Sequence, residues 1–239
     1  MAGHSKWANI KHRKERSDQK KGKIYSRLAK EIIVAVKHGG SDPKGNTKLR
    51  VAIQKARVWN LPNDIIERNI KKASQSDQQD FAEVTYELYG YGGVGIILEA
   101  MTDNKNRTAS DIRTSISKCG GTLATPGSVM FNFSRNGIFR ISKKKVLEEE
   151  LFLFSTENNA EDFQVEEEDF IVITAPMDFE KMKEALENKK ISIEECALQM
   201  IPKSWVMCSP EDEKLNQALI DSLENIDDVD EVFHNMELA

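Results

Sequence analysis

The residues of this sequence that are best suited to bind a ligand lie in its first 23 positions. From Lys6 to Lys23, eight of eighteen residues are Lys or Arg, and only Glu15 and Asp18 oppose them. Such a density is typical of a segment that contacts phosphates, because release of the counterions condensed on a nucleic acid drives binding. A solvated tail without a partner is the alternative. The predicted nucleic-acid-binding residues of this segment are Lys6, Trp7, Lys11, His12, Arg13, Lys14, Lys20, Lys21 and Lys23.

A second group of candidate residues lies between positions 90 and 107. The stretch "GYGGVG" at 90–95 satisfies GxGxxG, but strand-like "IILEA" follows it instead of a helix, which argues against a dinucleotide site. A Gly-rich hairpin loop is the simpler interpretation, and Tyr91 in it could stack on a base. The stretch "TDNKNRTASDIR" opens a helix, where Asn104, Lys105, Asn106 and Arg107 either bind an anion or serve only as cap and turn residues.

Residues typical of metal binding or catalysis do not form a recognisable pattern. Three cysteines lack CxxC spacing, four histidines lack partners at metal-ligand spacing, and no Ser-His-Asp or Cys-His combination emerges. We therefore expect no metal, no cofactor, no small-molecule substrate and no enzyme activity. An enzyme that uses the 90–107 region is a remote alternative. No apolar run is long enough to cross a bilayer and the N-terminus is not a secretory signal, so we expect a cytoplasmic protein without a membrane partner.

The charge of the chain is strongly segregated. Residues 1–72 carry a net charge of +13, residues 73–145 carry +2, and residues 146–239 carry -20, although the whole chain is only at -5. This asymmetry indicates a polyanionic partner for the N-terminal part and a solvated, acidic surface for the C-terminal part.

The elements that must position these residues begin with helices. Apolar residues at helical spacing predict amphipathic helices within 24–40, 46–60 and 61–74. Gly39, Gly40 and Pro43 end the first helix, and Asn46 or Thr47 caps the second. The polar stretch "SQSDQQD" then marks a linker.

From Val84 the periodicity changes to two, which predicts strands. The segments "VTYELYG" and "VGIILEAMT" are strand-like, a helix at 106–120 follows, and "RNG" at 135–137 resembles a hairpin turn between two short strands. From Gly137 to Met200 the order is β-α-β-β-α-β, the ferredoxin-like pattern. Because the lone strand near the C-terminus needs a sheet, we expect the last helix and strand to complete the middle domain.

The predicted fold class is therefore α+β with three domains, the third being ferredoxin-like and inserted in the second. A basic, helical nucleic-acid-binding domain spans 1–77, a discontinuous α+β domain spans 78–135 plus 207–239, and the acidic inserted domain spans 136–206.

Four segments of the chain resemble the YebC/PmpR family: "MAGHSKWANIKHRK", "GGSDPKGNTKLRVAIQKARVWNLPNDIIERNIKKA", "YGYGGVGIILEAMTDNKNRT" and "GGTLATPGSV". Members are described as probable transcriptional regulatory proteins, a mitochondrial relative is a translational activator of cytochrome c oxidase, and bacterial members have been linked to ribosomes. The resemblance implies a cytoplasmic three-domain protein without enzyme activity or cofactor. This chain departs from the family pattern at Leu88 and Tyr91, and at Ala124, Thr125 and Pro126.

The function that we expect is a non-catalytic, nucleic-acid-binding regulator of gene expression. A DNA-binding transcriptional regulator comes first, because the family description favours it, although no recognition helix is evident in the sequence. A translation factor that binds ribosomal RNA within the ribosome is the alternative, because shape recognition with a basic arm suits RNA. A scaffold that binds proteins through its acidic domain is a third possibility.

Overall fold

A computed structural model describes residues 21–75 and 81–237 of the chain. The fold is α+β and begins with a helical region, as predicted. The chain divides into two compact units, Met1–Pro126 with Val206–Ala239, and Gly127–Trp205. The second unit is inserted in the first, which confirms the predicted insertion. The boundary at 77, which would divide the first unit further, stays a prediction, as do the predicted bounds of the insertion at 135 and 206.

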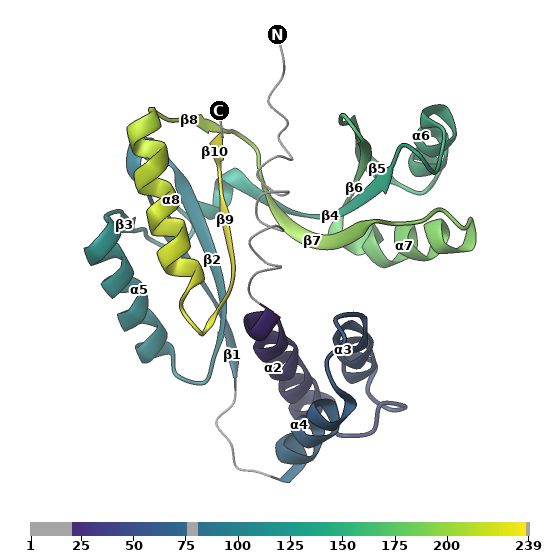
Figure 1. Cartoon of the computed structure of the whole chain (residues 1–239), viewed down its shortest axis with the longest axis horizontal. Coiled ribbons are helices and arrows are strands. Elements are labelled where there is room, and N and C mark those ends of the chain that lie inside the picture. The colour runs from purple at the N-terminus through teal and green to yellow at the C-terminus, as the bar shows by residue number, and fades with distance from the viewer. Residues whose placement is uncertain (1–20, 76–80, 238–239) are drawn as a thin grey trace. The chain divides into compact units, whose positions relative to one another are not determined.

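The first unit opens with three helices that pack on one another (Figure 1). Their shared core consists of small and branched side chains, with Ile32, Leu49 and Ala56 fully buried. Between the second and third helices, Asn60 adopts a left-handed conformation (φ 56°) and Pro62 follows, so the chain turns sharply there. The helices are α2 (Lys21–Gly39), α3 (Thr47–Val58) and α4 (Asn63–Gln75).

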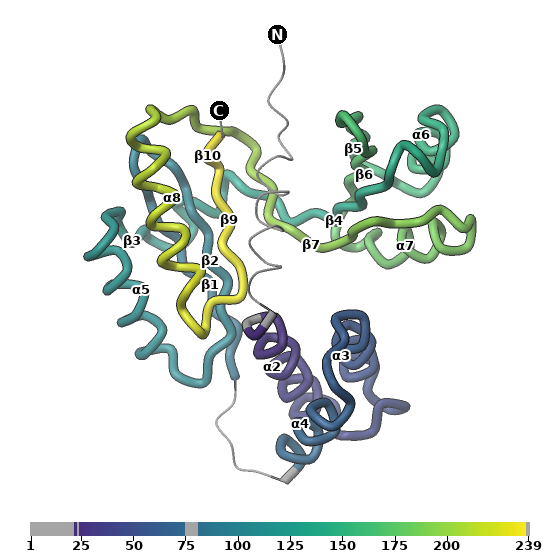
Figure 2. Tube along the Cα trace, in the orientation of Figure 1, coloured from purple at the N-terminus to yellow at the C-terminus, as the bar shows by residue number. Residues whose placement is uncertain are grey.

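A four-stranded antiparallel sheet follows in the same unit, with the strand order β3-β1-β2-β9. Strand β9, near the C-terminal end of the chain, pairs with β2, which is more than 120 residues earlier (Figure 2). This pairing confirms that the C-terminal helix and strand complete the middle of the chain. The strands are β1 (Ala82–Tyr89), β2 (Gly95–Thr102), β3 (Thr122–Leu123) and β9 (Val229–His234), with a short parallel pair of β8 (Val206–Met207) and β10 (Met236–Glu237) beside them.

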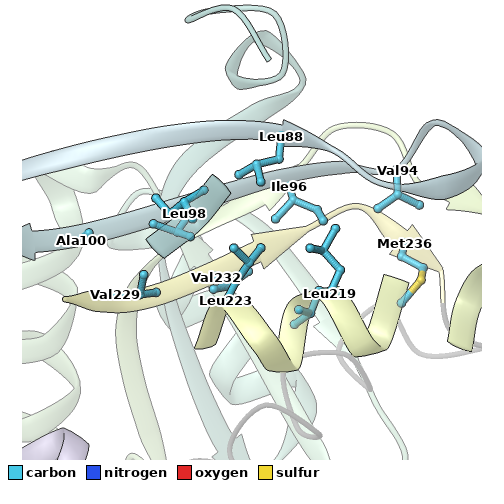
Figure 3. Packing of buried hydrophobic residues seen from close by; sticks show 12 residues of the cluster. Leu88, Val94, Ile96, Leu98, Ala100, Leu219, Leu223, Val229, Val232 and Met236 are labelled. Atoms are coloured by element: carbon cyan, nitrogen blue, oxygen red, sulfur yellow. The ribbon is translucent and has the colours of Figure 1, made fainter. Parts of the chain in front are cut away.

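Helices α5 (Lys105–Cys119) and α8 (Pro210–Glu224) cover one face of this sheet. Leu219 and Leu223 of α8 point at Ile96 and Leu98 of β2, and all four side chains are fully buried (Figure 3). Burying side chains of this size stabilises the fold by about 1.5–3 kcal/mol each. The packing therefore holds the ends of β2 and α5, which carry the predicted polar residues, in fixed positions.

The second unit has the ferredoxin-like arrangement. Its antiparallel sheet has the order β5-β6-β4-β7, and two helices share a core with it. The core contains Phe139, Val172, Met182 and Leu186, which are all fully buried. The elements are β4 (Phe133–Ser142), α6 (Glu148–Glu157), β5 (Ala160–Val165), β6 (Asp169–Thr174), α7 (Phe179–Asn188) and β7 (Glu195–Pro202).

The predicted hairpin turn at 135–137 is wrong, because β4 runs without interruption through this stretch. Gly137 pairs with Thr174 of β6 and with Leu198 of β7. A Cβ at Gly137 would come within 2.6 Å of the Phe179 ring, so this glycine makes room for a side chain of α7. Glycine inside a strand often marks such a close approach, and here that role explains the residue better than a turn.

Candidate nucleic-acid interface

Positive charge is concentrated in the helices α2, α3 and α4 of the first unit. Residues 21–75 carry 13 Lys and Arg against 4 Asp and Glu. Part of this charge is used inside the protein, because Arg27 of α2 binds Glu231 of β9 and its neighbour Glu31. The Lys30 ammonium donates hydrogen bonds to the carbonyl oxygens of Met101 (3.0 Å) and Asp227 (3.1 Å). These two cations therefore hold α2 against the sheet and are not available to a ligand.

Helix α3 is different, because it has basic residues and no acidic residue. Lys48, Arg50 and Arg57 are exposed, and none of them forms an ion pair with a carboxylate of the described residues. Lys55 lies 3.3 Å from Glu31, which offsets its charge in part. The opposite face of α3 buries Leu49, Ala52 and Ala56 against the other helices. Arg50 and Arg57, seven residues apart, lie on one side of α3, and Lys48 lies on the other side of the buried face.

Two apolar side chains accompany the basic ones at the end of α3. Val58 is 79% exposed and Trp59, directly after the helix, is 41% exposed. An exposed indole beside guanidinium groups is a typical platform for an unpaired base. We call Lys48, Arg50, Arg57, Val58 and Trp59 the α3 surface.

Asn46 fixes the start of α3. Its side-chain oxygen accepts a hydrogen bond from the Leu49 amide (3.0 Å), which caps the helix as the sequence predicts. Its amide nitrogen donates to the carbonyl oxygens of Ala35 (2.7 Å) and Gly40 (2.8 Å) at the end of α2. A Cβ at Gly39 would stand 2.7 Å from the Asn46 side chain, so this close approach requires glycine. Asn46 therefore sets the direction of α3 relative to α2.

The residues predicted in the N-terminal segment lie mostly outside the described part of the chain. Lys21 and Lys23 lie in the first turn of α2. The residues outside the described ranges are Lys6, Trp7, Lys11, His12, Arg13, Lys14 and Lys20.

The Gly-rich stretch forms a tight turn between β1 and β2, and Tyr91 in it is half-buried. The buried side chain of Asn216 in α8 accepts a hydrogen bond from the Tyr91 amide (2.7 Å) and donates one to its carbonyl oxygen (3.0 Å). The Tyr91 hydroxyl lies over Gly120, where a Cβ would collide with it. Tyr91 thus packs on the end of α5. Sequence reasoning missed Asn216, although an Asn at helical spacing from Leu219, Ile220 and Leu223 was a usable signal.

The start of α5 is built around an internal ion pair. Asn104 caps the helix by accepting a hydrogen bond from the Arg107 amide (3.1 Å). The Arg107 guanidinium donates to Asp228 (2.8 Å) and to Asp103 (2.8 Å), and its pKa is raised by these carboxylates. Lys105 and Asn106 are exposed. Of the four residues predicted here, Asn104 caps the helix, Arg107 is held by carboxylates, and the other two face solvent.

Asp228 is the buried centre of this arrangement. It also accepts hydrogen bonds from the hydroxyls of Thr102 (3.1 Å) and Thr108 (2.9 Å), and Lys30 of α2 lies 3.6 Å away. Burial alone would raise the pKa of Asp228, but the hydrogen bonds from Arg107, Thr108 and Thr102 outweigh burial and lower this pKa. One carboxylate therefore joins α2, α5 and the turn before β9.

The structure does not bring the two predicted loop regions together. Tyr89 pairs with Gly95 at one end of β2, and Ala82 pairs with Thr102 at the other end. Tyr91 and Asn104–Arg107 therefore lie at opposite ends of an eight-residue strand. In 21–75 and 81–237, no three potential metal ligands gather, and no helix is long and apolar enough to span a membrane.

Comparison with known proteins gives matches over nearly the whole chain. Residues 5–76 match the family described as "TACO1/YebC protein N-terminal domain", and residues 81–236 match "TACO1/YebC second and third domain". A probable transcriptional regulatory protein of Protochlamydia amoebophila is 59% identical over 238 residues and covers 100% of this chain and 97% of its own length. One from Chlamydia pneumoniae is 56% identical over 237 residues, 99% of this chain and 100% of its own length. The crystal structure of the conserved hypothetical protein Aq1575 from Aquifex aeolicus superposes with a TM-score of 0.80 at 40% identity, over 93% of this chain and 92% of that one.

Proposed function

Because the chain belongs to the TACO1/YebC family, we propose that it is a non-catalytic, nucleic-acid-binding regulator of gene expression that contacts phosphates through the α3 surface. The observation that carries this proposal is that Lys48, Arg50 and Arg57 are exposed on a helix without an acidic residue. Lys and Arg side chains supply many of the contacts that proteins make to a nucleic-acid backbone. DNA is the first candidate, since relatives are named probable transcriptional regulatory proteins.

The second unit is a poor candidate for the same role. RNA-recognition domains with a four-stranded sheet stack bases on aromatic side chains of that sheet. Here Phe139 of β4 and Phe170 of β6 are buried in the cluster that includes residues of α6 and α7. Residues 127–205 also carry 16 Asp and Glu against 10 Lys and Arg, which disfavours contact with phosphates. These features favour the first unit as the binding region.

The proposal is tested by measuring affinity for duplex DNA as a function of salt concentration. We expect that replacing Lys48, Arg50 and Arg57 with Gln lowers the log–log slope by about 2–3, since each lost phosphate contact removes about 0.7–0.9. The matched control replaces Lys144, Lys181 and Lys214, which are exposed elsewhere, and so changes the net charge equally. Equal slopes for the two triple variants would exclude α3 as the contact.

A ribosomal RNA partner is the second candidate, and the exposed Trp59 indole favours it. Unpaired bases stack on aromatic side chains, whereas the bases of a duplex are not accessible to them. Co-sedimentation with purified ribosomes, in the presence of excess duplex DNA, distinguishes the two candidates. Retention on ribosomes supports a translation factor, and complete loss to the DNA supports the DNA-binding regulator.

A further inference from the structure

The two helices of the second unit differ on their outer faces. Helix α7 buries Phe179, Met182 and Leu186 and presents charged residues to solvent, as expected for a helix on a sheet. Helix α6 buries Leu151 and Ser155, but it also exposes Phe152 (50%) and Leu153 (62%). The same core thus has one ordinary amphipathic helix and one that also exposes two large apolar side chains.

The exposed apolar residues of α6 continue onto the neighbouring strand. The Phe152 ring meets the Phe163 ring of β5 edge to face, with centroids 5.5 Å apart. Val165, two residues after Phe163 on the same side of this edge strand, is 48% exposed. We call Phe152, Leu153 and Val165 the α6 patch. Contiguous exposed apolar residues of this kind, bordered by charged ones, mark interaction sites.

The border of the α6 patch is mainly acidic, with Lys189 at its edge, 3.1 Å from Glu150. Glu149 lies three and four residues before Phe152 and Leu153, so it is next to both on the helix surface. Glu148 and Glu157 are also exposed on the same helix. Residues 146–180 contain 12 Asp and Glu and no Lys or Arg. The field around the α6 patch is therefore negative.

This field restricts what can cover the α6 patch. A second copy that docks through the same face would place carboxylates opposite carboxylates, which costs affinity. Nucleic acids and anionic lipid surfaces are repelled for the same reason. A Lys- and Arg-rich polypeptide with apolar anchor residues satisfies both the apolar surface and its acidic border.

We propose that the α6 patch is a docking site for a basic segment of a partner protein, with apolar side chains placed on Phe152 and Leu153. Its Lys and Arg residues then face Glu148, Glu149 and Glu157. The two units thereby take partners of opposite charge, a polyanion on the α3 surface and a cationic protein segment on α6. The proposal does not depend on whether the nucleic acid is DNA or RNA.

The test uses the full chain and two fluorescent 15-residue peptides in anisotropy titrations. One peptide combines Lys and Arg with three Leu residues at helical spacing, and the other has the same charge with Ser in place of Leu. We expect the Leu peptide to bind at least about tenfold more tightly, because a few anchor residues carry most of the binding energy of an interface. Leu153→Gln and Phe152→Gln should each remove most of this advantage. Met177→Gln, which alters an 87% exposed apolar residue outside the α6 patch, is the control.

Phe152→Gln also removes the contact between the Phe152 and Phe163 rings and so can disturb folding. Leu153→Gln is therefore the decisive variant, because Leu153 is the more exposed of the two residues. Equal binding of the two peptides, or an unchanged affinity of Leu153→Gln, would overturn the proposal. Sedimentation velocity on the chain alone supplies a further check. A dimer that Leu153→Gln abolishes would assign the α6 patch to a second copy. Loss of nucleic-acid affinity in Leu153→Gln would likewise contradict a protein partner.

Discussion

Two neighbouring helices, α2 and α3, carry similar charge but use it in opposite ways. On α2, Arg27 and Lys30 are bound by Glu231, Glu31, Asp228 and backbone carbonyl oxygens. On α3, Lys48, Arg50 and Arg57 meet no described carboxylate. The comparison teaches that a count of Lys and Arg does not locate a binding surface. What matters is the charge that remains once internal partners have been assigned.

The internal group of charges is strongly coupled. Burial alone would lower the pKa of Arg27, but Glu231 and other nearby carboxylates raise it. Arg107, 80 residues later, is held in the same way by Asp228 and Asp103. These pairs join helix α2 and helix α5 to β9 and to the turn before it, so they are part of the fold. We expect their loss to affect stability first.

The largest effect is expected from Asp228→Ala, which leaves Arg107, Thr102 and Thr108 without their shared acceptor. Breaking a buried, hydrogen-bonded ion pair costs about 3–5 kcal/mol, and the half-exposed Arg107 places this case near the lower value. Urea unfolding measures the loss. Asp227→Ala, which removes the neighbouring exposed carboxylate, is the matched control. A comparable loss in both variants would show that the ion pairs of α2 and α5 contribute little.

The next largest effect is expected on nucleic-acid binding, from changes in the basic N-terminal segment. Replacing Lys11, Arg13 and Lys14 with Ala removes three cations of the basic N-terminal segment, which lies outside the described residues. If this segment contacts phosphates together with α3, the log–log salt slope falls by about 2–3, and by twice that when the α3 triple variant is added. Salt titrations with one nucleic acid measure both. A slope that the N-terminal triple variant leaves unchanged would exclude this segment as a contact.

Trp59→Ala tests which kind of nucleic acid the α3 surface prefers. Stacking of an unpaired base on an indole is worth about 1–3 kcal/mol, so affinity for single-stranded or looped RNA should fall by that amount. Affinity for duplex DNA should change little, because its bases are not accessible. Val51→Ser, which alters a residue of α3 outside the α3 surface that is 41% exposed like Trp59, is the control. An equal loss on both nucleic acids would mean that Trp59 contributes by shaping α3 and not by stacking.

Much of the fold could be predicted because it depends on local signals. Asn46 begins α3 and Gly39 ends α2, as the short stretches around them predict. The return of β9 to the first sheet followed from a lone strand that needed a partner. The predicted hairpin at Gly137 was wrong because this glycine is required by the close approach of Phe179, 42 residues later. No local sequence pattern contains that contact.

The candidate site was harder to predict for the same physical reason. Arg107 looked suited to bind an anion, but its partner Asp228 lies 121 residues away in the chain. Lys48, Arg50 and Arg57 were not among the predicted site residues, because no local pattern in 46–60 distinguishes a free cation from a paired one. They matter because no carboxylate within residues 21–75 and 81–237 pairs with them, and such pairing is a property of the folded chain. Residue type is visible in a sequence, but the partner of a charge is not.

The smallest expected effect concerns Asp230 in β9, beside the cations of α2. Burial raises the pKa of Asp230 to about 6, against the opposing influence of Arg27 and Lys30. Since the ordinary pKa of Asp is about 3.9, the folded chain binds more protons than the unfolded chain between these values, and stability falls as pH rises through them. From pH 5 to pH 7 this carboxylate should reduce the free energy of unfolding by about 1 kcal/mol.

Asp230→Asn removes that titration while keeping a side chain of similar shape. The free energy of unfolding of this variant, minus that of the natural chain, should therefore grow by about 1 kcal/mol between pH 5 and pH 7. Urea unfolding at several pH values measures this difference, and groups common to both proteins cancel from it. A constant difference would mean that Arg27 and Lys30 keep Asp230 ionised across the range. In that case all charged groups at the contact between α2 and β9 would be ionised at every pH in this range. The two helices would then differ only in whether their cations have carboxylate partners.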